Sequence, residues 1–388
     1  ALADGQEVYP QLDGAIHRAL SAGKLEDERG RELVRELLEH PRRRRWVLVA
    51  NCERYRRWSL AAQLLNESRE ASFADAHEGE HLARLALALV ERLDPNTYGP
   101  RLIRDLEARA HATLGNALRL AGDLSRADDC FHAGRVCLEG SFDPLEEGSF
   151  LTLLASLRRD QRRFDEALAY LQRAIGIFEE VRANDLLVRA LTTQASLHLD
   201  QGAAEEALPP LLKALPLVEE AAEPRTAMAI QQNLAMCYAE LGRYHEAQRI
   251  WSANRRYYDR FGDRWTQLKA EWLEGIIAAA SGRAEHAEGC FTRVRDRYLE
   301  ERLDYDAAMV SLDLAMLYAE QGRAAELEAL AAAMLPVFAS HDIHREAKTA
   351  LSFFRRAVEM RQATVGVVRR VASYLKKSRL QPELSFEV

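Results

Sequence analysis

The residues with the most recognisable chemistry are 77 to 81, which read His-Glu-Gly-Glu-His. The pattern HExxH places two histidines one helical turn apart, where both can bind zinc while the glutamate activates water. Three features depart from such a site. Glu80 puts a charge between the histidines, Gly79 weakens a helix by about 1 kcal/mol, and Arg84 stands where the longer HExxHxxGxxH form has glycine. We therefore interpret the match as a solvated helix start, and a zinc hydrolase using Glu91 or Glu107 is only a formal alternative.

Two other sets of metal-binding or redox residue types are weaker. His341 and His344 can share a helix face, but no third ligand is evident, so we expect a surface or capping role. Cys130 and Cys137 lie about two turns apart on one helix, and we expect packing rather than a thiol switch. The patterns GxxxxGK[ST], GxGxxG and GxSxG do not occur. The sequence therefore predicts no enzyme, no metal site and no cofactor.

A basic run precedes the HExxH residues. Arg42 to Arg45 stand near Trp46, and the next residues add Arg54, Arg56 and Arg57 with Tyr55 and Trp58. Cations beside aromatic rings can bind phosphates or an acidic protein, but a charge run is more often a solvated face, which we favour. The chain has 53 Lys and Arg against 60 Asp and Glu, a net charge of -7. This balance argues mildly against nucleic acid as the main partner.

Composition indicates a soluble cytoplasmic protein. Hydrophobic residues make up 48% of the 388 residues, but no apolar run approaches the ~20 residues that span a bilayer. The first residues lack the basic and apolar segments of a signal peptide. The five cysteines form no CxxC pair, so reduced thiols are the simplest expectation.

The elements that must position any site repeat along the chain with a fixed period of 40 residues. A small residue recurs at Gly115, Ala155, Ala195, Ala235, Gly275 and Ala315. A turn position recurs at Gly122, Arg162, Gly202, Gly242, Gly282 and Gly322. The start of a second helix recurs at Ala127, Ala167, Ala207, Ala247, Ala287 and Leu327. Such a period is the signature of a solenoid built from helix-turn-helix units.

The repeated residue types have a physical reason. Two helices approach closely only where facing positions carry little side chain, hence Gly or Ala on the first helix. Four residues after the recurring alanine of the second helix stands a large residue, such as Phe131 or Phe291, which we expect to fill the space between neighbouring units. In the last unit this position is Ala331, which underfills the space. The turn glycine allows positive φ, which costs other residues about 1 kcal/mol or more. Arg162 is therefore expected to make a different or strained turn.

This pattern resembles the tetratricopeptide repeat, and the resemblance covers residues 101–340 well and 46–95 weakly. It implies an all-α fold, a right-handed α-solenoid of stacked helix-turn-helix repeats. The usual family period is ~34 residues, so this is a long variant. Pro209, Pro210 and Pro216 fall in the third unit's second helix, where we expect a bend near residue 210.

We divide the chain accordingly. The predicted segments are 1–45, N-terminal helices including one at 11–22 and one at 25–40; 46–100, a degenerate leading repeat; 101–340, six repeats; 341–377, C-terminal capping helices; and 378–388, an extended tail.

In the family the first helices line a binding groove, so the resemblance implies the partner-binding positions. The first three units place there a basic and polar set: Arg109, Asn116, Arg119, Thr152, Ser156, Arg159, Arg189 and Thr192. The last three units place there an apolar, methionine-bearing set: Gln232, Met236, Trp272, Ile276, Leu312 and Met316. Such residues suit adaptable binding of a peptide or helix, and equally they can be core if the repeats twist tightly. Ala112 replaces the lysine of the carboxylate clamp that grips chaperone tails, which argues against that partner class.

The sequence thus predicts a non-catalytic interaction module that binds a peptide or protein segment in the groove. The alternative is the sensor part of a bacterial transcriptional or signalling regulator that binds a peptide or small-molecule effector. A fold alone does not decide between them.

Overall fold

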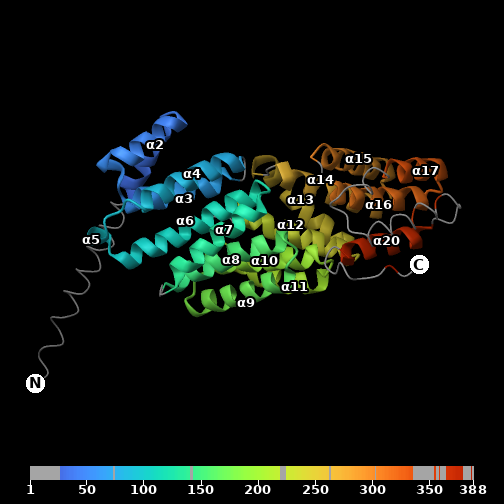
Figure 1. Cartoon of the computed structure of the whole chain (residues 1–388). Coiled ribbons are helices and arrows are strands. Elements are labelled where there is room, and N and C mark those ends of the chain that lie inside the picture. Colours follow the sequence, from blue (N-terminus) through green and yellow to red (C-terminus); the bar gives the residue numbers. More distant parts are fainter. Residues whose placement is uncertain are drawn as a thin grey trace, which may run out of the picture. The chain divides into compact units, whose positions relative to one another are not determined.

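The computed structural model describes residues 27–72, 75–139, 143–218, 224–261, 264–301, 303–334 and 364–378, with Phe354, Val358 and Phe386. Within these ranges all regular structure is helical (Figure 1). The chain forms two compact units. The first comprises the described residues up to Gln161 with Gly176–Val181, and the second comprises Arg162–Ile175 with the described residues from Arg182 onward. The predicted helix at 11–22, His341 and His344 lie outside the described residues.

The first unit opens with short helices that share one apolar core. Residues 27–38 are helical, followed by α2 (Arg42–Asn51), η1 (Glu53–Tyr55), α3 (Trp58–Ala71), α4 (Ala76–Val90) and α5 (Pro95–Tyr98). Leu37, Leu60, Leu64, Leu85 and Leu89 are fully buried in this core. The helical spacing of these leucines is what buries one face of each helix.

The repeats continue the first unit as α6 (Pro100–Leu120), α7 (Leu124–Leu138) and α8 (Pro144–Asp160). The next helix, α9 (Phe164–Glu180), is divided: its residues 164–175 belong to the second unit and its residues 176–180 to the first. The second unit continues with α10 (Asn184–Asp200), α11 (Ala204–Ala214), η2 (Leu215–Leu217), α12 (Pro224–Glu240), α13 (Tyr244–Phe261), α14 (Arg264–Ala280), α15 (Ala284–Glu300), α16 (Asp304–Glu320), α17 (Ala324–Ala333) and α20 (Val365–Ser378).

The helix bounds confirm the 40-residue period. The first helices α8, α10, α12, α14 and α16 begin at residues 144, 184, 224, 264 and 304. The second helices α7, α9, α11, α13, α15 and α17 begin at residues 124, 164, 204, 244, 284 and 324. The described part of the chain is therefore an all-α array of helix-turn-helix repeats. A division into two compact units is not evident in the repeat pattern.

The predicted turns also have the expected backbone. Gly122, Gly202, Gly242, Gly282 and Gly322 all have positive φ, between 64° and 86°. Arg162 keeps the same left-handed conformation with φ 62°, so its turn is strained rather than different in type. All five of these glycine turns share the hydrogen bond that closes them, from the N–H after the glycine to a carbonyl near the end of the first helix: Asp123 to Leu118, Ala203 to His198, Arg243 to Tyr238, Arg283 to Ala278 and Arg323 to Tyr318.

Close approach explains the small residues on the first helices. A Cβ atom added at Gly115 would lie 2.8 Å from the Phe131 ring, and one added at Gly275 would lie 2.7 Å from the Phe291 ring. Both rings are buried. The alanines at the equivalent positions of the other four units are fully buried. The second helix thus packs its large side chain directly over the small residue of the first.

One second helix differs from the pattern. Helix α11 continues through Pro209 and Pro210 but ends after 11 residues, and the chain goes on as the 3₁₀ turn η2 around Pro216. Proline therefore shortens this helix, since it lacks the N–H that would extend the ladder.

At the far end of the second unit, Val368, Val371 and Leu375 of α20 pack in one core with α16. Two residues of the predicted extended tail 378–388 are described. Ser378 ends helix α20, so the tail begins one residue later than predicted, and Phe386 is non-helical and buried, with its ring 4.9 Å from that of Tyr374. No helix in the described ranges combines the length and apolar character needed to cross a membrane.

The Gly115 contact gives a test with an internal control. Gly115→Ala forces the Phe131 ring to move, and we expect it to lower the free energy of unfolding by about 1–3 kcal/mol. Gly176→Ala meets no atom within 4 Å, so helix propensity alone should raise stability by about 0.5–1 kcal/mol. Urea denaturation of both variants measures the difference, and equal effects would contradict the close approach.

The strained turn at Arg162 gives a second test. Arg162→Gly and Arg162→Ala remove the same side-chain contacts and differ only in how well they tolerate positive φ. We expect the glycine variant to be more stable than the alanine variant by about 1 kcal/mol, since the left-handed conformation penalises a Cβ. Thermal unfolding compares them, and an alanine variant of equal or greater stability would show that the turn is not strained.

Candidate functional site

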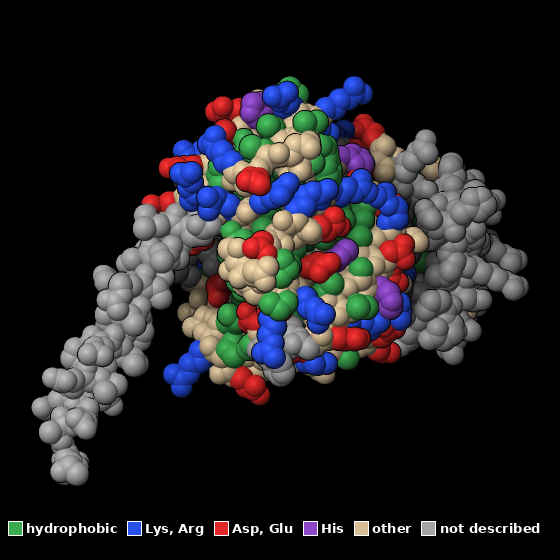
Figure 2. Space-filling view, turned by 60° about the vertical axis from the view of Figure 1, so that its left-hand side comes forward, with side chains coloured by type: hydrophobic (Ala, Val, Ile, Leu, Met, Phe, Trp, Pro, Cys, Tyr) green, Lys and Arg blue, Asp and Glu red, His purple; other side chains and the backbone are tan. Residues whose placement is uncertain are grey.

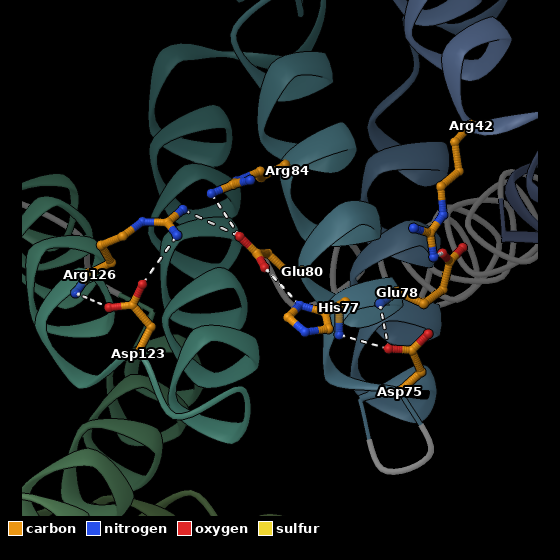
Figure 3. Close-up of polar contacts among 8 residues, drawn as sticks. All are labelled: Arg42, Asp75, His77, Glu78, Glu80, Arg84, Asp123 and Arg126. Carbon is orange, nitrogen blue, oxygen red and sulfur yellow. Dashed lines mark hydrogen bonds and ion pairs between the residues drawn. The ribbon is translucent and has the colours of Figure 1, made fainter.

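The HExxH residues form the start of α4 (Figure 3). The side chain of Asp75 caps the helix by accepting hydrogen bonds from the backbone N–H groups of His77 and Glu78, at 2.9 and 3.2 Å. Glu78 forms ion pairs with Arg42 and with Arg45, the latter at 2.9 Å. The glutamate that would activate water is therefore held by two guanidinium groups.

The remaining groups of the motif have different surroundings. Glu80 pairs with Arg84 at 2.7 Å and with Arg126 at 3.3 Å. The His77 side chain is 79% exposed. In contrast, His81 packs edge-on against Trp46 with ring centroids 6.0 Å apart, and its burial lowers the pKa of the imidazole. Arginine pairing and helix capping account for the contacts of both glutamates and of the helix start, whereas the buried Nε2 atom of His81 has no hydrogen-bond partner among the described residues.

The basic run contributes to structure as well as to the surface. Arg45 donates hydrogen bonds to the carbonyl oxygens of Leu38 and His40 in addition to Glu78, and its side chain is only 12% exposed. Arg54 pairs with Glu36. Arg43 and Arg44 are exposed. On the face drawn in Figure 2, basic side chains form a band with acidic side chains beside it, so charges of both signs are mixed there.

The cysteines are all free. Burial raises the pKa of Cys130 and of Cys137 to about 11, and Glu107 adds to the shift at Cys137. Thiols with such pKa values are protonated at neutral pH and are poor nucleophiles. This argues against a thiol switch at either residue.

The predicted binding residues of the first unit form a polar network on α6 and α8. Arg119 donates a hydrogen bond to Asp160 at 2.5 Å and two to Asn116 at 3.1 and 3.0 Å. Arg159 also pairs with Asp160, at 3.2 Å. Arg119 is only 11% exposed, and its burial lowers the pKa of the guanidinium while Asp160 opposes that shift. Arg119 thus joins neighbouring repeats, whereas Arg159 keeps more of its side chain in solvent.

Hydroxyl groups line the same helices. Thr152 and Ser156 of α8, and Thr192 of α10, each donate a hydrogen bond to the carbonyl oxygen four residues earlier. These bonds satisfy the hydroxyls locally and leave the side chains half-buried. Arg109 donates a hydrogen bond to Asn66 at 2.9 Å and lies 3.9 Å from Glu146. Arg189 is half-buried on α10.

The apolar set of the second unit is more deeply placed. Leu312 is fully buried and Gln232 is 8% exposed, so neither offers a surface to a partner. Trp272 donates a hydrogen bond to Asp313 at 2.6 Å and packs edge-on against Tyr298. The core explanation that the sequence left open therefore applies to Leu312 and Gln232. Trp272, Met236, Ile276 and Met316 are half-buried beside the core clusters.

Two sets of equivalent positions differ in burial. The framework column, defined as Gly115, Ala155, Ala195, Ala235, Gly275 and Ala315, is buried in all six repeats. The variable column, defined as Asn116, Ser156, Ser196, Met236, Ile276 and Met316, is half-buried in all six. The first column is uniform in residue type, while the second changes from polar to apolar. Packing therefore constrains the first column and leaves the second partly available for contact.

Sequence reasoning missed the partners of these side chains. Asp160, Asp313 and Asn233 sit on first helices and bond to Arg119, Trp272 and Ser196 of the preceding repeat. The signal for two of them was available: Asp160 follows Arg119, and Asp313 follows Trp272, by one period plus one residue. Neighbouring first helices place such positions side by side.

The Arg119 network predicts a stability effect. Arg119→Met removes the guanidinium and leaves the Asp160 carboxylate with only part of its hydrogen bonding, so we expect a loss of about 1–3 kcal/mol. Arg163→Met removes an exposed pair with Glu166 and should cost less than about 0.5 kcal/mol. Urea unfolding at neutral pH measures both, and similar losses would mean that the Arg119 network is not structural.

Comparison with known proteins agrees with this architecture. Residues 147–220 match the family model described as tetratricopeptide repeat. A Rap protein solved with competence and sporulation factor is 14% identical, with 83% of this chain and 88% of that chain covered and a TM-score of 0.58. The apo form of RapI is 15% identical, with 71% and 99% covered and a TM-score of 0.51.

A third solved structure is a Signal Transduction ATPase with Numerous Domains protein from Pyrococcus horikoshii, which carries a tetratricopeptide repeat sensor. It is 14% identical, with 92% of this chain and 52% of that chain covered and a TM-score of 0.50. No curated protein sequence matches this chain. At these identities the likeness concerns the fold.

Proposed function

We propose that this chain, whose residues 147–220 match the tetratricopeptide-repeat model and whose helices recur every 40 residues, is a non-catalytic module that binds a peptide or protein segment along first helices of its repeats. The observation that carries the proposal is the variable column, which is half-buried at every repeat although its residue types change. A framework that is constant in type and buried needs no partner to explain it. A half-buried column that differs from repeat to repeat is suited to recognition.

The chemistry of the column suggests the kind of segment bound. Asn116, Ser156 and Ser196 are polar, although each already has a hydrogen-bond partner within the chain. Met236, Ile276 and Met316 offer adaptable apolar contacts. Arg159 and Arg189 add half-buried cations beside the polar residues. Within the second unit alone, a segment with an acidic or polar part would match Arg189 and Ser196, and an apolar part would match Met236, Ile276 and Met316.

A second candidate is the sensor part of a bacterial regulator that responds to a peptide or small-molecule effector. The supporting observation is the likeness in fold to a Rap protein that was solved with competence and sporulation factor, and to a protein whose tetratricopeptide repeats are a sensor. Under this proposal the bound segment changes the chain's conformation. Under the first proposal, binding leaves the helices as they are.

Selected peptides test the binding face. Short random peptides displayed on phage are selected on the wild-type chain, and their affinities are then measured by fluorescence anisotropy. We expect Arg159→Glu and Met316→Glu each to weaken at least some selected peptides by about tenfold or more, because each changes the charge or removes the apolar contact at the proposed face.

Matched controls are Arg135→Glu and Val136→Glu, which make the same kinds of change at exposed positions of α7. They should leave affinity unchanged, and circular dichroism checks that all four variants fold. Selection of no peptide, or equal loss in both sets of variants, would contradict the proposal. Hydrogen exchange with and without a selected peptide distinguishes the sensor, for which protection changes away from the contacted helices.

A further inference from the structure

A cluster of metal-binding residue types lies between α6 and α7, on side chains that the proposed function does not use. Glu107 and His111 are four residues apart on α6, and Cys137 is on α7. One ligand atom of each residue lies within 4.8 Å of those of the other two. All three residues are half-buried, and burial together with the Glu107 carboxylate raises the pKa of the Cys137 thiol. The fold thus brings together a carboxylate, an imidazole and a thiol from two helices.

These three donors suit a zinc-type ion. Carboxylate oxygen, imidazole nitrogen and thiolate sulfur bind Zn²⁺ at about 2.0–2.3 Å, so the ligand atoms of a tetrahedral site lie roughly 3.3–3.8 Å apart. Side-chain shifts of about 1 Å are enough to reach that geometry from the present one. Glu and His four residues apart on a helix project to the same side, which fixes two of the three ligands in advance.

The imidazole also has an unexplained feature. Its Nδ1 atom is buried and has no hydrogen-bond partner among the described residues, as is also true of His81 Nε2. A buried polar atom of this kind normally has a partner, and a bound ion or water would supply one to His111. Glu91 also acts on His111 electrostatically, and its negative charge favours a nearby cation.

A second cluster of the same composition provides a comparison within the chain. Glu274, His286 and Cys290 also place ligand atoms within 4.8 Å of one another. There, however, His286 Nε2 already lies 2.8 Å from a Glu274 oxygen, and Arg293 Nη2 lies 3.6 Å from the Cys290 sulfur. A guanidinium in contact with the sulfur repels a metal cation. At Cys137, Arg104 lowers the pKa of the thiol by less than Glu107 raises it.

We propose that Glu107, His111 and Cys137 form a binding site for a divalent zinc-type ion, with water as the fourth ligand. On binding, the sulfur–hydrogen bond of Cys137 breaks, its proton leaves to solvent, and the thiolate electron pair forms the bond to the metal. Nothing is oxidised or reduced. The ion links the two helices of one repeat and stabilises their packing.

Cobalt titration of the full chain tests the site, since Co²⁺ substitutes for Zn²⁺ and reports thiolate ligation by its charge-transfer absorption. The wild type is titrated with Co²⁺ under a non-thiol reductant, and zinc is then added. We expect one equivalent of Co²⁺ with a thiolate band that zinc abolishes. Cys137→Ser should lose the band, and His111→Asn should bind at least tenfold more weakly.

Cys290→Ser is the matched control, because it removes the thiol of the second cluster and should keep the band. Circular dichroism confirms that each variant is folded. Absence of a thiolate band in the folded wild type at micromolar metal would overturn the proposal. So would a band that survives Cys137→Ser, or one that Cys290→Ser removes.

Discussion

The contact between a small residue on the first helix of a repeat and a large side chain on the second is the constraint on which the other features depend. At Gly115 and Gly275 even one added carbon would lie under 3 Å from an aromatic ring. Such contacts cannot be made by chance along a chain, because every repeat must bring its two helices to the same separation. Repeating that contact requires every unit to keep the same helix and turn lengths, and the constant 40-residue period and the recurring left-handed turns meet this requirement.

The same constraint separates framework from recognition. The framework column is buried, so its residues are restricted to glycine and alanine. The adjacent variable column lies one position further along the helix and is half-buried, so its residue types are free to change. The proposed binding by residues of the variable column therefore requires no change in the residues of the framework column. This arrangement lets one scaffold present a polar surface on some repeats and an apolar surface on others.

Sequence alone predicts most of the fold because its signals are local and repeated. Turn glycines, small residues and helix starts recur at fixed positions, and the structure confirms them. Arg162 shows both the strength and the limit of this reasoning: the strained position was predictable, but the chain retains the left-handed turn where a change of turn type was also expected. The prolines of α11 led us to expect a bend near residue 210, whereas the structure shows a helix that passes through Pro209 and Pro210 and ends after 11 residues in a 3₁₀ turn.

The candidate face was less predictable because burial depends on neighbouring helices. Leu312 and Gln232 occupy the same repeat position as the half-buried Thr152, yet both are buried by their surroundings. Likewise, Glu107 and His111 have a suggestive spacing, but only the packing of α7 brings Cys137 beside them. A period identifies equivalent positions, whereas the size of adjacent side chains decides which of them reach solvent.

A double-mutant cycle on Gly115→Ala and Phe131→Leu tests the central contact most directly. Leucine at position 131 removes the ring atoms that a Cβ at position 115 would meet. The account predicts that alanine costs at least about 1 kcal/mol less in the Phe131→Leu background than in the wild type, a coupling typical of residues in contact. Free energies of unfolding that add, with no coupling between the two substitutions, would contradict it.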